Sequence, residues 1–99
     1  MKHELKTDPA VFDAVDRGDK TFEIRFNDRD YQVGDTLHLR KTRYAGAEMA
    51  AGAPLDYTGD YCLARVTYVL RGPIYGLEDG WCILSMGELA LTMPPGGKE

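Results

Sequence analysis

Four short segments of alternating polar and apolar residues, one nearly continuous apolar segment and one helical segment are spread along this 99-residue chain. These five non-helical segments are predicted strands, and they are residues 2–6, 20–26, 36–41, 61–70 and 81–86. The last of them is expected to be buried on one face or both. A chain of this length fits one domain. Five short strands in so small a domain bury both faces of their sheet only by curling into a barrel or closing against the helix. We therefore predict an α+β, mainly β fold: a small, partly open β-barrel with one or two flanking helices.

The helical segment has recognisable ends. Asp8 offers a side-chain oxygen as an N-cap, and Pro9 suits the first helical position because the N–H that proline lacks has no partner there. Gly18 is placed to end the helix. The sequence therefore predicts a helix over residues 9–17, whose apolar stripe is formed by Val11, Phe12 and Val15.

The strand predicted over residues 20–26 carries a high density of charge. Its alternation predicts that the apolar face packs on the core, and this face holds Phe22 and Ile24. The polar face holds Thr21, Glu23 and Arg25. Lys20 and Glu23 have opposite parity on a regular strand, so they converge only if the chain bends near Thr21. A polar turn, Asn27-Asp28-Arg29-Asp30, follows.

Two segments lack the regular spacing of apolar residues that is typical of a helix or a strand. Residues 44–60 are rich in Gly and Ala, which predicts a long loop with a helical turn near residues 47–51. Residues 87–99 end in Pro and Gly and are predicted to form a flexible tail, so the domain is expected to span residues 1–86. Trp81, in the last strand, is expected to lie in the core.

Composition and charge limit the classes of function. No apolar run approaches the ~20 residues of a transmembrane helix, and residues 1–6 lack the apolar region of a signal peptide. We therefore expect a cytoplasmic protein with no membrane partner. The net charge is −4, but residues 20–43 hold six basic and four acidic side chains, a local +2. This suits a small phosphate-facing patch and argues against strong non-specific nucleic-acid binding, which needs many phosphate contacts.

Metal ligands are few and far apart in the sequence. The only cysteines, Cys62 and Cys82, lie in separate apolar runs and are expected to be reduced and packed as small apolar side chains. His3 and His38 add no metal-ligand spacing. No phosphate loop or dinucleotide fingerprint is present. We expect no metal and no other cofactor.

A resemblance to a known family rests on two motifs. The first is GDKTFEIR, residues 18–25, and the second is YQVGD, residues 31–35. Together with the helix before them, they resemble the ASCH domain of the PUA-like superfamily. When GPIYGL, residues 72–77, is included, the resemblance extends over residues 2–86. Over this range the sequence closely resembles a bacterial and phage family of small ASCH-like proteins. The resemblance implies a PUA-like β-barrel with a cleft at the helix-to-strand joint that holds RNA or a nucleotide.

The chemistry of single side chains assigns each a role in binding RNA or a nucleotide. Lys20 and Arg25 would contact phosphate, with Thr21 beside them. Glu23 would accept from a base edge or a ribose hydroxyl, and Tyr75 would stack on a base. These five residues are the predicted ligand-binding set.

One ASCH branch suggests an alternative function, because it is an amidohydrolase that deacetylates acetylcytidine. Its catalytic lysine corresponds to Lys20, whereas its threonine three residues later is Glu23 in this chain. Glu78 lies in the later segment where that branch has a glutamate. The alternative is thus a hydrolase of a modified nucleoside or of RNA, with Lys20 and Glu23 as its acid/base pair.

The same residues also have plainer interpretations. Lys20 would favour the helix dipole at the helix C-terminus. Glu23 and Arg25 would form a surface ion pair worth at most about 1 kcal/mol, and Tyr75 would pack in the core. A protein-interaction module without a small ligand is then a third possibility, and no oligomeric state is predicted.

Overall fold

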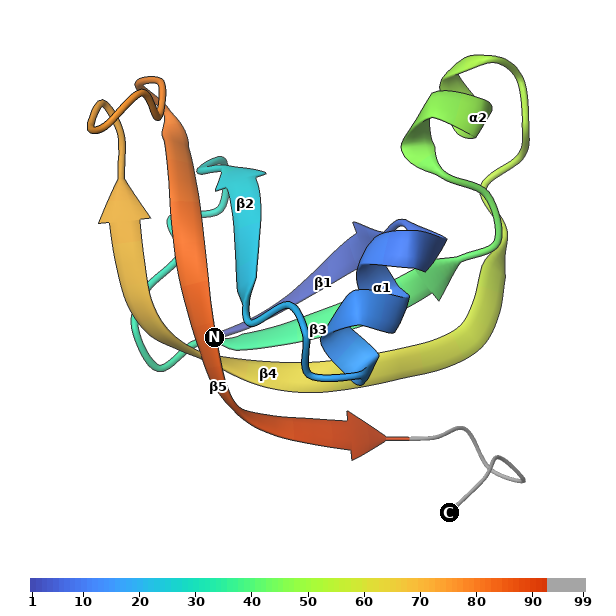
Figure 1. Ribbon diagram of the computed structural model, residues 1–99, viewed down its shortest axis with the longest axis horizontal. Coiled ribbons are helices and arrows are strands. Elements are labelled where there is room, and N and C mark those ends of the chain that lie inside the picture. The colour runs from blue at the N-terminus through green and yellow to red at the C-terminus, as the bar shows by residue number, and fades with distance from the viewer. Residues whose placement is uncertain (93–99) are drawn as a thin grey trace.

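The computed structural model describes residues 1–92, and these form one curled sheet around a short helix (Figure 1). The elements in chain order are β1 (Lys2–Thr7), α1 (Pro9–Asp16), β2 (Phe22–Phe26), β3 (Thr36–Thr42), α2 (Gly46–Ala50), β4 (Tyr57–Arg71) and β5 (Trp81–Thr92). The strand order is β1-β3-β4-β5-β2. Within residues 1–92, β1 and β3 pair in parallel and every other strand pair is antiparallel. The predicted mainly β fold with short helices is confirmed, and the sheet is an open half-barrel. Neither helix in this part of the chain has the length and hydropathy needed to cross a bilayer.

The two longest strands give the sheet its curl. β4 has 15 residues and β5 has 12, and both bend midway along their length (Figure 1). Their pairing shifts register between Leu63 and Arg65 and again between Val66 and Tyr68. Such irregularities bend a strand and increase its twist. The first half of β4 therefore pairs with β3, while the N-terminal half of β5 pairs with β2 on the other side of the core.

The core fills the inside of this half-barrel. α1 lies within the curl and contributes Phe12 and Val15 (Figure 1). The buried apolar side chains of the strands are Leu5, Leu37, Leu39, Cys62, Ala64, Val66, Val69, Cys82 and Leu84. Asp8 stands at the predicted N-cap, but its carboxylate accepts from the backbone N–H of Gly46 at 3.0 Å and does not cap α1. It thereby ties the start of α2 to the start of α1.

Two strand boundaries differ from the sequence prediction. β4 begins at Tyr57, inside the expected loop, and β5 continues beyond residue 86 to Thr92 along β4. Residues 87–92 are therefore strand, and the remainder of the expected tail, residues 93–99, lies outside the described residues. Pairing with a long neighbouring strand extends these segments, although their own β propensity is weak. The helical turn expected near residues 47–51 is confirmed as α2.

The prediction for the two faces of β2 is wrong. Phe22 and Ile24 are 43% and 50% exposed, whereas Glu23 is 2% exposed and lies opposite the buried Leu84. The reason is that β2 is an edge strand whose inner side holds Glu23 in an ion-paired cluster with Lys20 and Arg25. Phe22 and Ile24 stay partly exposed and line a cleft. Trp81, expected in the core, is 38% exposed.

Candidate functional site

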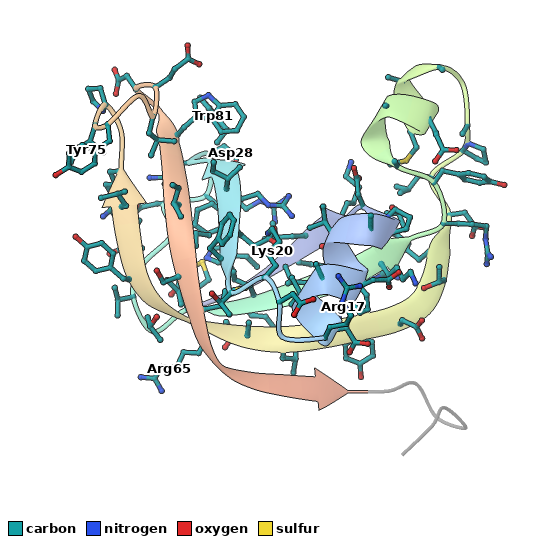
Figure 2. All side chains as sticks on the ribbon, viewed as in Figure 1. Arg17, Lys20, Asp28, Arg65, Tyr75 and Trp81 are labelled. Atoms are coloured by element: carbon teal, nitrogen blue, oxygen red, sulfur yellow. The ribbon has the colours of Figure 1, made fainter. Side chains whose placement is uncertain are left out.

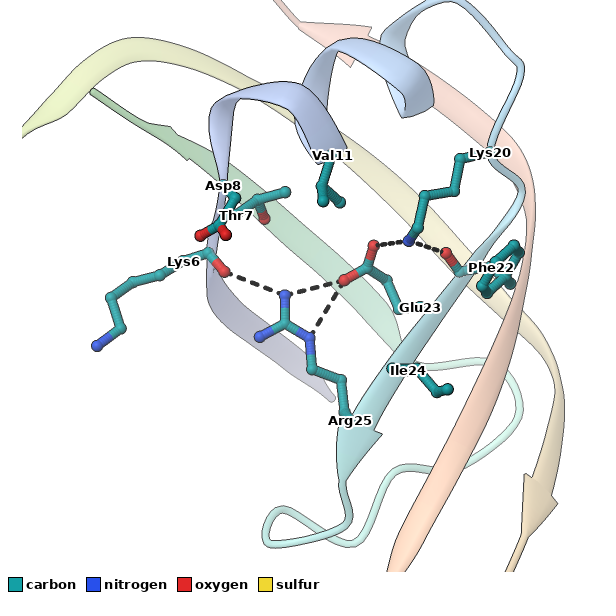
Figure 3. Close-up of a pocket in the computed structure, with 9 residues that line it drawn as sticks. All are labelled: Lys6, Thr7, Asp8, Val11, Lys20, Phe22, Glu23, Ile24 and Arg25. Carbon is teal, nitrogen blue, oxygen red and sulfur yellow. Dashed lines mark hydrogen bonds and ion pairs between the residues drawn. The ribbon is translucent and has the colours of Figure 1, made fainter. Parts of the chain in front are cut away.

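Glu23 lies at the centre of the site, between two cations (Figure 3). Lys20 Nζ lies 2.6 Å from Oε2, and Arg25 Nη2 lies 2.9 Å from Oε1. Arg25 Nε donates to the same Oε1 at 3.2 Å. The glutamate side chain is 3% exposed, that of the lysine 20% and that of the arginine 25%. The carboxylate is therefore fixed in place, and the two cations more than balance its charge.

A bend between α1 and β2 brings Lys20 to this carboxylate. Gly18, at φ +83°, ends the helix in a conformation that glycine adopts without strain. The backbone N–H of Lys20 donates to the carbonyl of Ala14 at 3.1 Å, so this residue still belongs to the helix end. Its ammonium group donates to the carbonyl of Phe22 and lies 4.6 Å from the centre of that ring. Lys20 and Glu23 therefore meet, although they would have opposite parity on a regular strand.

Arginine side chains bridge the opening between β2 and β1. Arg25 Nη2 donates to the carbonyl of Lys6 at 3.1 Å. Arg29, in the loop after β2, donates from Nη1 to the carbonyl of Glu4 at 2.8 Å. β1 and β2 are the two edge strands of the sheet. Side chains, and not a backbone ladder, therefore join the two edges of the half-barrel.

A cleft of about 260 Å³ opens beside the charged group (Figure 3). It is lined by Lys6, Thr7, Asp8, Val11, Lys20, Phe22, Glu23, Ile24 and Arg25. Three of these side chains are cationic and two are carboxylates, a local charge of +1. Among the described residues, Arg25 Nη1 has no hydrogen-bond partner, and the contacts above use two of the three donors of Lys20. Both cations therefore keep a donor for a ligand.

The structure does not bring every predicted site residue to this cleft. Thr21 is exposed and does not line it. Tyr75 lies in the loop between β4 and β5, is 93% exposed and stands well apart from Lys20 (Figure 2). Glu78 belongs to the same loop and does not line the cleft either. Within residues 1–92, no three metal-ligating side chains come together.

A second cleft, of about 360 Å³, lies along β2 from the first. It is lined by Ile24, Arg25, Phe26, Asp28, Arg29, Tyr31 and Trp81. Sequence reasoning assigned neither Arg29 nor Trp81 to a site, since it placed one in a turn and the other in the core. The one signal in the sequence was a second arginine just beyond Arg25, inside the polar turn.

A buried polar cluster around Asp35 supports the fold away from both clefts. Its carboxylate lies 2.8 Å from His3 Nε2 and accepts from the backbone N–H of Gln32 at 3.0 Å. Burial by itself would raise the pKa of Asp35, but these hydrogen bonds and the amino group of Met1 outweigh it and hold the pKa at about 2. The Gly34-Asp35 motif therefore anchors the turn before β3 and lines neither cleft.

Comparison with known proteins places the clefts inside a recognised domain. A family model described as a domain of unknown function, DUF3850, matches residues 2–86. All residues that line the two clefts fall within this match. No curated protein matches the chain.

Proposed function

The chain belongs to the DUF3850 family, and we propose that it binds a nucleotide, free or within RNA, in the cleft beside Glu23. In this proposal the half-barrel is an ASCH-type member of the PUA-like superfamily and acts in the cytoplasm. The observation that carries the proposal is the buried carboxylate held between Lys20 and Arg25, both of which line the cleft and keep a donor.

Each of the three side chains has a separate role in the proposed binding. Arg25 offers Nη1, and guanidinium groups bind phosphate and other planar acceptors well. Lys20 offers its third proton as a point charge. A carboxylate has about four lone-pair sites, and three of those on Glu23 are occupied by its contacts with Lys20 and Arg25. Its main role is thus to orient the two cations, with one site left for a base amino group or a ribose hydroxyl.

The size of the cleft favours a single nucleotide unit. Pockets for drug-sized ligands measure roughly 300–1,000 Å³, and this one measures about 260 Å³. One base with its sugar suits such a space, with the phosphate at the rim near Lys6 and Arg25. The local charge of +1 also agrees with an anionic ligand that is held by few contacts.

Binding of nucleoside monophosphates and of RNA pools, by calorimetry and fluorescence anisotropy at low and moderate salt, tests this function. Arg25→Gln is expected to weaken binding by roughly 10–150-fold, the effect of losing a hydrogen bond to a charged group. Arg43→Gln is the matched control, because Arg43 pairs with Asp56 at 2.8 Å outside both clefts. Absence of binding to every ligand, or equal losses in both variants, would overturn the proposal.

A second candidate function, hydrolysis of a modified nucleoside or of RNA, rests on the 2.6 Å contact between Lys20 and Glu23 at the wall of the cleft. An amine in direct contact with a carboxylate can act as an acid/base pair. Mass spectrometry of acetylcytidine and of RNA after incubation with the wild type and with Lys20→Ala separates the outcomes. Product from the wild type alone supports hydrolysis, and unchanged substrate with both proteins eliminates it.

A further inference from the structure

The second cleft extends the proposed site beyond one nucleotide. We propose that the protein binds single-stranded nucleic acid of at least two nucleotides, with the second base stacked at Trp81 and the linking phosphate between Arg25 and Arg29. This inference rests on the proposed function and specifies its ligand as an oligonucleotide, as opposed to a free mononucleotide.

The two clefts adjoin each other along β2. Both are lined by Ile24 and Arg25, so no strand or helix separates them. Their volumes, about 260 and 360 Å³, are similar. Each therefore suits one base with its sugar. Arg25 stands at the boundary, where the phosphate that links two adjacent nucleotides would lie.

Charge in the second cleft also favours a phosphate near this boundary. Arg29 is 44% exposed, and the carbonyl of Glu4 accepts from its Nη1. The carboxylate of Asp28 lies 4.0 Å from Arg29 Nε and is 61% exposed, so it screens the cation weakly. With Arg25 the cleft holds two cations and one carboxylate, again a local charge of +1.

Two partly exposed aromatic rings form the apolar part of this cleft. Trp81 on β5 and Phe26 on β2 are cross-strand partners, 38% and 53% exposed. Their ring centres lie 5.8 Å apart at an interplanar angle of 77°, an edge-to-face contact. This contact holds both rings in place and leaves them open to solvent. Exposed aromatic side chains beside arginines form the stacking platforms of proteins that bind single strands.

The loop that carries Arg29 is already held in position. The backbone N–H of Asn27 donates to the carbonyl of Gly80 at 2.7 Å, and the Asn27 side chain accepts from the N–H of Tyr31 at 3.1 Å. Arg71 Nη2 donates to the carbonyl of Tyr31 at 3.0 Å. Loop residues 27–31 are thus tied to the end of β4 and to the residue just before β5. A preorganised subsite loses less entropy when a ligand binds.

Comparison of uridine monophosphate with the dinucleotide UpU tests this subsite. By calorimetry, UpU is expected to bind roughly 5–150-fold more tightly, the gain from stacking one further base. UpU carries less charge than the mononucleotide, so added charge cannot explain such a gain. Trp81 is the only tryptophan, so quenching of the intrinsic fluorescence by UpU reports on the subsite directly.

Four substitutions test which residues contribute to the tighter binding of UpU. Trp81→Ala and Arg29→Gln are expected to reduce UpU affinity toward that of the mononucleotide, while mononucleotide affinity stays within about twofold, as for surface substitutions. Asp28→Asn removes a like charge and is expected to strengthen UpU binding. Tyr75→Ala is the control, an exposed aromatic outside both clefts that should change neither affinity. Arg29→Gln and Asp28→Asn are surface changes, so they decide the question even if Trp81→Ala does not fold.

The failures of the two proposals look different. If the mononucleotide binds but UpU binds no more tightly and leaves the tryptophan unquenched, the subsite is wrong and the proposed function stands. If neither ligand binds, both are overturned. If Trp81→Ala alters only self-association in sedimentation and not UpU affinity, the aromatic pair is a protein contact, and the subsite proposal is refuted.

Discussion

Replacing Glu23 by glutamine is expected to destabilise this protein more than replacing Phe22 by alanine. The alternation of the sequence predicts the opposite order. A core phenylalanine costs roughly 3–5 kcal/mol when it is truncated to alanine, whereas a surface substitution costs less than about 0.5 kcal/mol. The two positions are adjacent on β2, so their comparison tests which face of that strand points inward.

The magnitude for Glu23 follows from its two cations. Glutamine keeps the shape of the side chain but turns an amide NH₂ toward either Lys20 or Arg25. Removal of one partner from a buried ion pair costs roughly 3–5 kcal/mol. The lysine and arginine side chains are 20% and 25% exposed, so water compensates in part for the charged contact that each would lose. We expect Glu23→Gln to lower the free energy of unfolding by about 2–3 kcal/mol after allowing for that hydration.

The magnitude for Phe22 follows from its exposure. With 43% of the residue exposed, truncation loses about half of the roughly 1.5–3 kcal/mol that full burial contributes. No enclosed cavity is left behind. The contact with the Lys20 ammonium, 4.6 Å from the ring centre, adds about 0.5 kcal/mol. Phe22→Ala should therefore cost about 1–2 kcal/mol.

Urea midpoints with fitted m-values measure these changes. Leu84→Ala, the buried cross-strand partner of Glu23, is the core control and should cost roughly 2–5 kcal/mol. The double variant Lys20→Met/Glu23→Gln should be at least as stable as Glu23→Gln alone, because it leaves no ammonium without its partner. A loss above about 3 kcal/mol for Phe22→Ala, with less than about 0.5 kcal/mol for Glu23→Gln, would refute the reasoning.

Three further predictions concern the scaffold. The folded pKa of Asp35, about 2, lies below the ordinary value of 3.8, so the stability that this carboxylate contributes is present above pH 4 and is lost as the pH falls toward 2. The loss is about 2 kcal/mol, measured as the difference between urea midpoints of the wild type and of Asp35→Asn across that range. Gly80→Ala should cost about 1–2 kcal/mol or more, because φ is +87° and the new Cβ would lie 2.8 Å from the Phe26 ring; Gly18→Ala, at φ +83° in open space, should show the backbone part alone. Burial raises the pKa of both thiols, that of Cys62 to about 11, so neither should react with iodoacetamide at neutral pH until urea unfolds the chain; rapid labelling of the folded protein would contradict this.

Local signals in the sequence explain most of what could be predicted of the fold. Pro9 and Gly18 delimit α1 because a proline start and a glycine end are local chemistry. Alternation located the strands but not the inner face of β2, since it shows which residues share a face and not which face is inside. The length of β4 and β5 depends on pairing between distant segments, which no local window contains.

The candidate site likewise has one part that the local sequence predicts and another that depends on pairing between distant segments. Lys20, Glu23 and Arg25 lie within six residues, so their meeting needed only one bend in the chain. Arg29 and Trp81 come together through the register between β2 and β5, which is a long-range property. Tyr75 lies away from Lys20 because the β4–β5 loop projects from the sheet (Figure 2).

The arginines that join β2 to β1 also occupy carbonyl groups on an edge of the sheet. An edge strand presents unpaired carbonyl groups that can template a strand of another molecule, and this is a common route to aggregation. On β1, the carbonyls of Glu4 and Lys6 already accept from Arg29 and Arg25. An anion that drew both guanidinium groups away would therefore uncover this edge. Each arginine therefore affects both ligand binding and coverage of the β1 edge. A substitution that improves ligand binding also changes how readily this edge pairs with a strand of another molecule.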